Sequence, residues 1–185
     1  MVYIKHLHIY TSRFVENLAQ NLTTILEKHT KCSLYVRQLT AEDIKKQTEN
    51  EFFMIITPQS TLSRSAFNIL KPNTYFIYQT EQINTNERSS KYHNNLSMYN
   101  LLNKAYQVFD YSEDNILLYP NTYIKKPLLL PFVSNENIYT EDKKSIDILF
   151  YGTLNQRRYI IIEVLKQLLP KINIVVEEKI FGKEL

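Results

Sequence analysis

Residues 146–158 read IDILFYGTLNQRR, a pattern that predicts a buried strand, a glycine turn and the start of a basic helix. Such a turn suits a phosphate group. The backbone can approach an anion closely at Gly152, and the unpaired N–H groups of the first helical turn point towards it. Arg157 and Arg158 add forked donors at the same place. The pattern therefore predicts a phosphate site; the alternative is a tight turn whose arginines are solvated.

Short apolar segments alternate with amphipathic segments along the rest of the chain. Strands are predicted where β-branched and aromatic residues cluster, and helices where apolar residues recur at helical spacing. The predicted strands are 2–10, 32–39, 52–57, 74–78, 107–111, 127–131, 146–151 and 172–176. The predicted helices are 12–26, 40–50, 60–70, 95–106, a short one after Ser112, and 155–169. This alternation predicts an α/β fold, a mainly parallel Rossmann-like sheet flanked by helices.

Two polar segments interrupt the alternation. Residues 84–94 are rich in Asn, Ser and charged residues and predict a loop, whereas 134–145 is the segment most typical of a linker. We therefore predict a Rossmann-like domain over 1–133, a linker over 134–145, and a second, partial unit over 146–185.

The amino-acid composition argues against several kinds of binding site and protein class. The chain has 185 residues, a net charge of +3, one cysteine and two glycines. So few glycines exclude the Gly-rich phosphate loops of Walker or dinucleotide-binding type. The mild charge, with lysines spread along the chain, disfavours nucleic-acid binding. The apolar runs are too short to span a membrane, and a single cysteine suits a reducing compartment, so we expect a cytoplasmic protein.

Four pieces of the sequence occur in an order and spacing that resemble one enzyme family. They are Tyr75–Gln82, Val108–Ser112, Leu130–Phe132 and Asp147–Arg158. Together they resemble glycosyltransferases of the two-Rossmann-domain (GT-B) architecture, of the group-1-like kind found in bacteria and large DNA viruses. The first 70 residues match only as a generic Rossmann-like half. For a viral protein, the expected compartment is the host cytoplasm.

The resemblance implies a division of labour between two domains. The N-terminal domain of such enzymes faces the acceptor, and the C-terminal domain binds the nucleotide-sugar, which is a donor substrate rather than a cofactor. Gly152, Asn155, Arg157 and Arg158 would lie near the donor diphosphate. Glu81, at the end of a buried strand, is a candidate base for the acceptor hydroxyl; the favoured alternative for it is a capping or loop cluster. Asp110-Tyr111-Ser112 lies at another strand end, where Ser112 is equally well explained as a helix cap.

The family pattern continues past Phe181–Leu185, where this sequence stops. We therefore expect either a piece of a longer protein or a reduced relative, inactive by itself, with self-association or a further domain covering its second unit. The competing hypothesis is a non-catalytic binding or assembly module that retains the scaffold, since fold alone does not imply activity.

The remaining candidates are histidines. His6 and His8 lie two residues apart on one predicted strand, a spacing compatible with metal ligation. No cysteine or carboxylate near them in sequence completes a ligand set, so a plain histidine pair is the favoured interpretation and no metal is expected.

Overall fold

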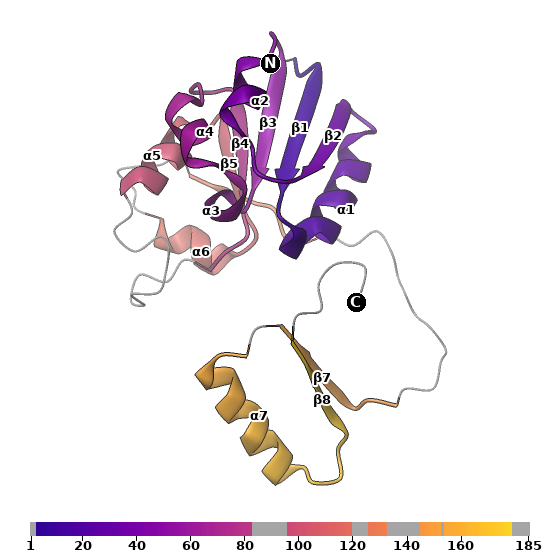
Figure 1. Cartoon of the computed structure of the whole chain (residues 1–185). Coiled ribbons are helices and arrows are strands. Elements are labelled where there is room, and N and C mark those ends of the chain that lie inside the picture. The colour runs from indigo at the N-terminus through magenta and orange to yellow at the C-terminus, as the bar shows by residue number, and fades with distance from the viewer. Residues whose placement is uncertain (1–2, 83–95, 120–125, 133–144, 153, 179–185) are drawn as a thin grey trace. The chain divides into compact units, whose positions relative to one another are not determined.

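The computed structural model describes residues 3–82, 96–119, 126–132, 145–152 and 154–178 (Figure 1). The chain divides into two compact units, Met1–Asn135 and Glu136–Leu185, which we call the first and second units. The predicted loop at 84–94, nearly all of the predicted linker at 134–145, and residues 181–185 lie outside the described residues.

The first unit is built on a six-stranded parallel sheet with the order β2-β1-β3-β4-β5-β6. This confirms the predicted α/β, Rossmann-like class. The central strands are runs of apolar residues because both of their faces are covered. The strands are β1 His6–Thr11, β2 Lys31–Val36, β3 Glu51–Ile56, β4 Tyr75–Gln79, β5 Gln107–Asp110 and β6 Leu128–Leu129.

Helices lie on both faces of this sheet (Figure 1). On one face, α1 buries Ala19 and Leu22 in a cluster with Leu7 and Ile9 of β1. The opposite face packs side chains of α2, α4 and α5, including Ile44, against the other side of β1, β3 and β4. The helices are the short 3-10 helix η1 Arg13–Val15, then α1 Glu16–Leu26, α2 Ala41–Lys45, α3 Pro58–Thr61, α4 Arg64–Ile69, α5 Leu96–Lys104 and α6 Glu113–Leu118.

An aromatic stack lies where β1 and β2 run side by side. Tyr10 and Tyr35 are partners in the register, and their rings stack with centroids 4.7 Å apart. The Arg37 guanidinium lies 5.2 Å from the Tyr10 ring and 5.1 Å from the Tyr35 ring. Two hydrogen bonds of 2.8 Å each join it to Asp43, which also completes the capping box that Thr40 begins for α2. The predicted start of this helix at Thr40 is confirmed, but the helix ends at Lys45 and not near residue 50 as predicted.

Two further helix predictions in the first unit are wrong in detail. The helix predicted over 60–70 is two short helices, α3 and α4, because Leu62 is extended and forms a parallel bridge with Leu39 before Ser63 caps α4. Ser12 does not cap a helix with its side chain, because the chain leaves β1 through the 3-10 turn of η1.

The second unit is a single β-α-β motif made of β7 Ile148–Tyr151, α7 Gln156–Leu168 and β8 Ile174–Glu177. Its two strands pair in parallel, as predicted. Ile162 is its one buried hydrophobic residue among those the structure describes. Within the described residues of both units, no helix combines the length and the apolar character needed to cross a membrane.

Candidate functional site

Four buried polar residues gather at what we call the carboxyl edge of the first unit. Thr11, Gln79 and Asp110 end β1, β4 and β5, and Thr57 follows β3 directly; their exposed fractions are 0–5%. Because these strands are parallel, their carboxyl ends meet at one edge of the sheet, the edge at which open α/β sheets bind ligands. Buried polar groups at this place require partners.

Asp110 has the most complete set of partners. Its carboxylate accepts hydrogen bonds from the Ser112 N–H at 3.0 Å, the Asn115 amide at 3.1 Å and the Tyr119 hydroxyl at 2.8 Å. Burial raises the pKa of Asp110, while these hydrogen bonds act to lower it. Ser112 also caps α6 through the Asn115 N–H, which confirms its predicted capping role. These hydrogen bonds give Asp110 a structural role, because they attach α6 to the end of β5.

Glu81 lies two residues beyond β4, where its main chain is held and its side chain is exposed. The Glu81 carbonyl accepts hydrogen bonds from the Gln79 amide at 3.0 Å and from the Asn115 amide at 2.8 Å. Its backbone is therefore tied to the carboxyl edge, and its carboxylate faces solvent. That position suits an acid or base acting on a bound acceptor, and its role stays a prediction.

Thr57 is a feature of this edge that sequence reasoning missed. Its backbone is left-handed, with φ of 54°, which is an outlier for a β-branched residue. Its N–H donates to the Tyr78 carbonyl at 3.0 Å, and its hydroxyl contacts that of Thr80. Strained backbone of this kind gathers at ligand sites. No local pattern signals this conformation, since a residue before proline is expected to be extended.

Ser12 adds an unsatisfied group beside β1. Among the described residues, no hydrogen-bond partner accompanies its buried Oγ atom. A buried hydroxyl in this state is unfavourable by itself, and a ligand or water supplies the missing partner in many proteins.

In the second unit, Gly152 makes the predicted turn at the end of β7. Its φ is +119°, a conformation that L residues rarely adopt, and its N–H donates to the Glu177 carbonyl at 3.1 Å. A Cβ atom at this position would meet nothing within 4 Å. Glycine is therefore needed for the backbone conformation, and the space above the turn is open to a ligand.

The start of α7 carries two occupied backbone N–H groups. Asn155 is the N-cap, and its side-chain oxygen accepts from the Arg158 N–H at 3.0 Å. The Leu154 N–H donates to the Glu178 carboxylate at 3.1 Å. Glu178 follows β8 and was missed by the sequence analysis, because only the parallel pairing of β7 and β8 brings it to this turn.

Both arginines of the predicted phosphate site are exposed at the first turn of α7. The Arg158 guanidinium lies 5.8 Å from the Phe150 ring centroid. The structure thus brings Gly152, Asn155 and the two arginines to one end of one motif, as the sequence predicted. Their binding of a diphosphate stays a prediction.

The arrangement offers two kinds of chemistry. At the carboxyl edge of the first unit lie the strained Thr57, the buried Ser12 hydroxyl and the exposed Glu81 carboxylate. In the second unit, the turn at Gly152 is followed by two arginines, and the Leu154 N–H donates to the Glu178 carboxylate. Neither the protein-family models nor the curated proteins compared with this chain match it.

Proposed function

We propose that this chain belongs to a GT-B-type glycosyltransferase, which transfers a sugar from a nucleotide-sugar donor to an acceptor hydroxyl. The first unit would be the acceptor-side domain, and the second would begin the donor-binding domain. The observation that carries the proposal is the contact between the Leu154 N–H and the Glu178 carboxylate. An anionic oxygen already lies at the turn where the donor diphosphate is expected.

In the proposed reaction, the acceptor oxygen bonds to the anomeric carbon of the sugar. The bond from that carbon to the diphosphate oxygen breaks, the nucleoside diphosphate leaves, and the acceptor proton passes to Glu81. Arg157, Arg158 and the backbone at Gly152 stabilise the charge on the leaving diphosphate, and Asn155 orders the helix start that presents these groups. We place this reaction in the cytoplasm, which for a viral protein is that of the host.

Donor binding is the first test. Calorimetric titration of the purified chain with UDP- and GDP-sugars is expected to show saturable binding that Arg157→Ala/Arg158→Ala weakens about tenfold or more, since two charge-assisted contacts are removed. Lys166→Ala/Lys171→Ala is the matched control, because it removes the same charge from exposed positions at and beyond the other end of α7. Absence of donor binding by the intact chain contradicts a donor site here.

A Glu178→Gln variant is a second test of donor binding at this turn. The proposal holds that the Glu178 carboxylate occupies an N–H group that the donor also uses. Removing its charge should tighten donor binding several-fold, as expected when a competing anion is lost. Weaker binding in this variant would show instead that Glu178 organises the turn for the ligand.

The acceptor side is tested by sugar transfer in the full natural protein that carries this sequence. Glu81→Gln is expected to lower kcat by about 100-fold or more with little change in donor affinity, because general base catalysis is worth about that much. Glu113→Gln, an exposed carboxylate in the first turn of α6, is the control. Unchanged transfer in Glu81→Gln removes Glu81 from the mechanism.

A second candidate function is a non-catalytic binding or assembly module. The observation that favours it is the exposure of large apolar side chains in the second unit, including Tyr151 at 55%, Ile160 at 53% and Ile161 at 49%. Such surfaces mark interaction sites. Sedimentation that depends on protein concentration, together with no donor binding, supports this function over the enzyme.

A further inference from the structure

The amino ends of β1, β2 and β3 carry a second polar cluster, away from the carboxyl edge. His6 and His8 are two residues apart on β1 and so lie on one face of the sheet. Glu51 begins β3 and is the register partner of His6, which brings a carboxylate to the same face. The pairing of β1 with β3 thus brings a carboxylate beside the histidines, although no carboxylate lies near them in the sequence.

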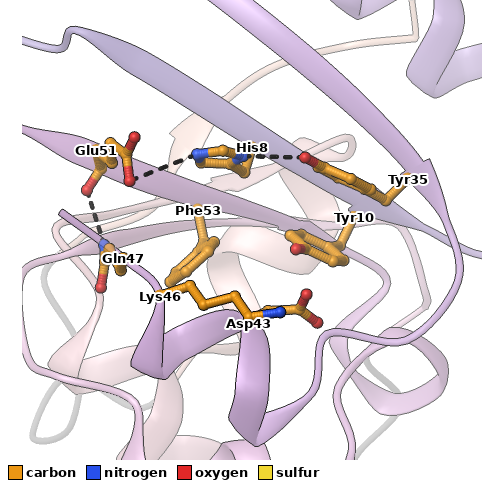
Figure 2. Close-up of a pocket in the computed structure, with 8 residues that line it drawn as sticks. All are labelled: His8, Tyr10, Tyr35, Asp43, Lys46, Gln47, Glu51 and Phe53. Atoms are coloured by element: carbon orange, nitrogen blue, oxygen red, sulfur yellow. Dashed lines mark hydrogen bonds and ion pairs between the residues drawn. The ribbon is translucent and has the colours of Figure 1, made fainter.

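A cavity of about 240 Å³ opens beside this cluster, between the sheet and α2 (Figure 2). Figure 2 shows Glu51 and Tyr35 reaching towards the His8 ring from either side. His8 and Glu51 of the cluster both line this cavity.

The three side chains lie close enough to share one ion. His6, His8 and Glu51 each present a ligand atom, and these atoms all lie within 4.8 Å of one another. The histidine rings stack with centroids 4.1 Å apart, and His8 Nε2 lies 3.8 Å from a Glu51 carboxylate oxygen. Zinc bonds to histidine nitrogen and carboxylate oxygen are about 2.0–2.2 Å long, so the three ligand atoms must move closer together to bind one ion.

Neighbouring groups hold each of the three in place. Ser33 Oγ lies 2.9 Å from His6 Nε2, and the Tyr35 hydroxyl lies 3.4 Å from His8 Nδ1, which leaves His8 Nε2 facing Glu51. The Thr48 N–H donates to the Glu51 carboxylate at 2.8 Å. Outer contacts of this kind orient metal ligands.

We propose that His6, His8 and Glu51 bind one divalent transition-metal ion of the zinc class, with a further coordination position open to the cavity. Two imidazoles and one carboxylate are a ligand set of catalytic zinc sites, in which water or substrate takes the fourth position. The site lies at the amino ends of the strands of the first unit, whereas the carboxyl edge lies at their other ends, so its test does not depend on sugar transfer.

The test is zinc titration of the intact chain after treatment with a chelator. Calorimetry is expected to show one ion per chain, and His8→Asn and Glu51→Gln are each expected to weaken binding about tenfold or more. His29→Asn is the matched control, because His29 is exposed and outside the cluster. Cys32→Ser is the second control, because Cys32 pairs with Leu7 and lies on the other face of β2.

Two measurements on the unaltered chain keep the test independent of variant folding. Cobalt(II) is expected to give visible bands of nitrogen and oxygen ligation without a thiolate charge-transfer band. Added zinc is expected to raise the Tm, and chelator to reverse the rise. No saturable zinc binding by the intact chain, or equal binding by the wild type and both ligand variants, would overturn the proposal.

Discussion

The two units use the same parallel β-α-β geometry, yet they bury their strands to very different extents. In β3 of the first unit every residue from Phe52 to Ile56 is buried, whereas in β7 of the second unit Leu149 is 48% and Tyr151 is 55% exposed. Among the described residues, the first unit has helices on both faces of six strands, and the second has one helix and two strands. Strand pairing alone therefore does not form a core, whereas covering both faces of the sheet does.

Truncation of a strand side chain should show the largest difference in stability cost between the two units. Ile77→Ala in β4 removes a fully buried side chain and is expected to destabilise the first unit by about 2–5 kcal/mol. Leu149→Ala in β7 should cost less than about 1.5 kcal/mol, because roughly half of its side chain is already in water. Hydrogen exchange followed by mass spectrometry measures each unit separately. Equal losses at the two sites contradict the comparison.

The next effect concerns a carboxylate in each unit. Asp110→Ala is expected to cost about 2–4 kcal/mol, because it removes a buried carboxylate that accepts hydrogen bonds from the Asn115 amide and the Tyr119 hydroxyl. Asp147→Ala removes an acceptor of the Asn173 N–H at 2.8 Å from an exposed site and should cost about 1 kcal/mol or less. Urea denaturation of both variants gives the comparison.

Asp110 also predicts a dependence on pH. Because burial raises its pKa in the folded chain, the folded state binds a proton more tightly than the unfolded state does. Its contribution to stability is therefore full below the unfolded pKa of about 3.9 and is lost as the pH rises through the raised folded value. Asp110→Asn should lack this dependence; an unchanged profile contradicts the assignment to Asp110.

The ion pair of Arg37 with Asp43 gives a smaller effect on stability, with the opposite dependence on pH. The Arg37 guanidinium holds the pKa of Asp43 well below its usual range. Asp43 thus stabilises the fold above its unfolded pKa of about 3.9, and this contribution is lost as the pH falls towards the lowered folded value. Asp43→Asn should cost about 1–2 kcal/mol at neutral pH, since the ion pair and the capping box are both weakened.

The matched pair in the second unit is Lys166 with Glu163, whose side chains are 49% and 41% exposed. Glu163→Gln should cost less than about 0.5 kcal/mol, since water and salt screen an exposed pair. Urea midpoints at pH 7 and pH 3 check both variants. A larger loss for Glu163→Gln than for Asp43→Asn contradicts the expectation.

Loss of a helix cap should give the smallest difference in stability cost between the two units. Ser112→Ala in α6 and Asn155→Ala in α7 each delete an N-cap acceptor and are expected to cost about 1 kcal/mol. A cap acts locally and needs no core, so the two losses should match. Hydrogen exchange at the first turn of each helix measures them; a difference above about 1 kcal/mol shows that packing controls one cap.

The sequence predicted the eight described strands because each contains apolar, β-branched or aromatic residues close together, which is a local pattern. It also placed the glycine turn, the helix start at Thr40, the cap at Ser112 and a helix start at about Asn155, all of which depend on neighbouring residues. It failed at 60–70, where the bridge between Leu39 and Leu62 overrides helical spacing. A contact made by another strand leaves no periodic signal.

The candidate sites divide in the same way. The grouping of Gly152 with Asn155 and the two arginines follows from one continuous stretch. Glu51 beside His8, and Glu178 on the Leu154 N–H, each join residues far apart in the chain through parallel strand pairing. Without the sheet order, neither pair has a sequence signature, and the sequence analysis therefore favoured a plain histidine pair.

The stack of Tyr10 and Tyr35 has a consequence for optical spectroscopy. The chain has no tryptophan, so its near-ultraviolet signals come from tyrosine and phenylalanine. The buried tyrosines Tyr10, Tyr75 and Tyr78 are all in the first unit, and burial raises the pKa of Tyr78 to about 12. Tyr151 and Tyr159 of the second unit are both more than half exposed. Near-ultraviolet circular dichroism and tyrosine emission should therefore follow melting of the first unit almost exclusively. The natural tyrosines can thus be used to monitor unfolding of that unit without an added label.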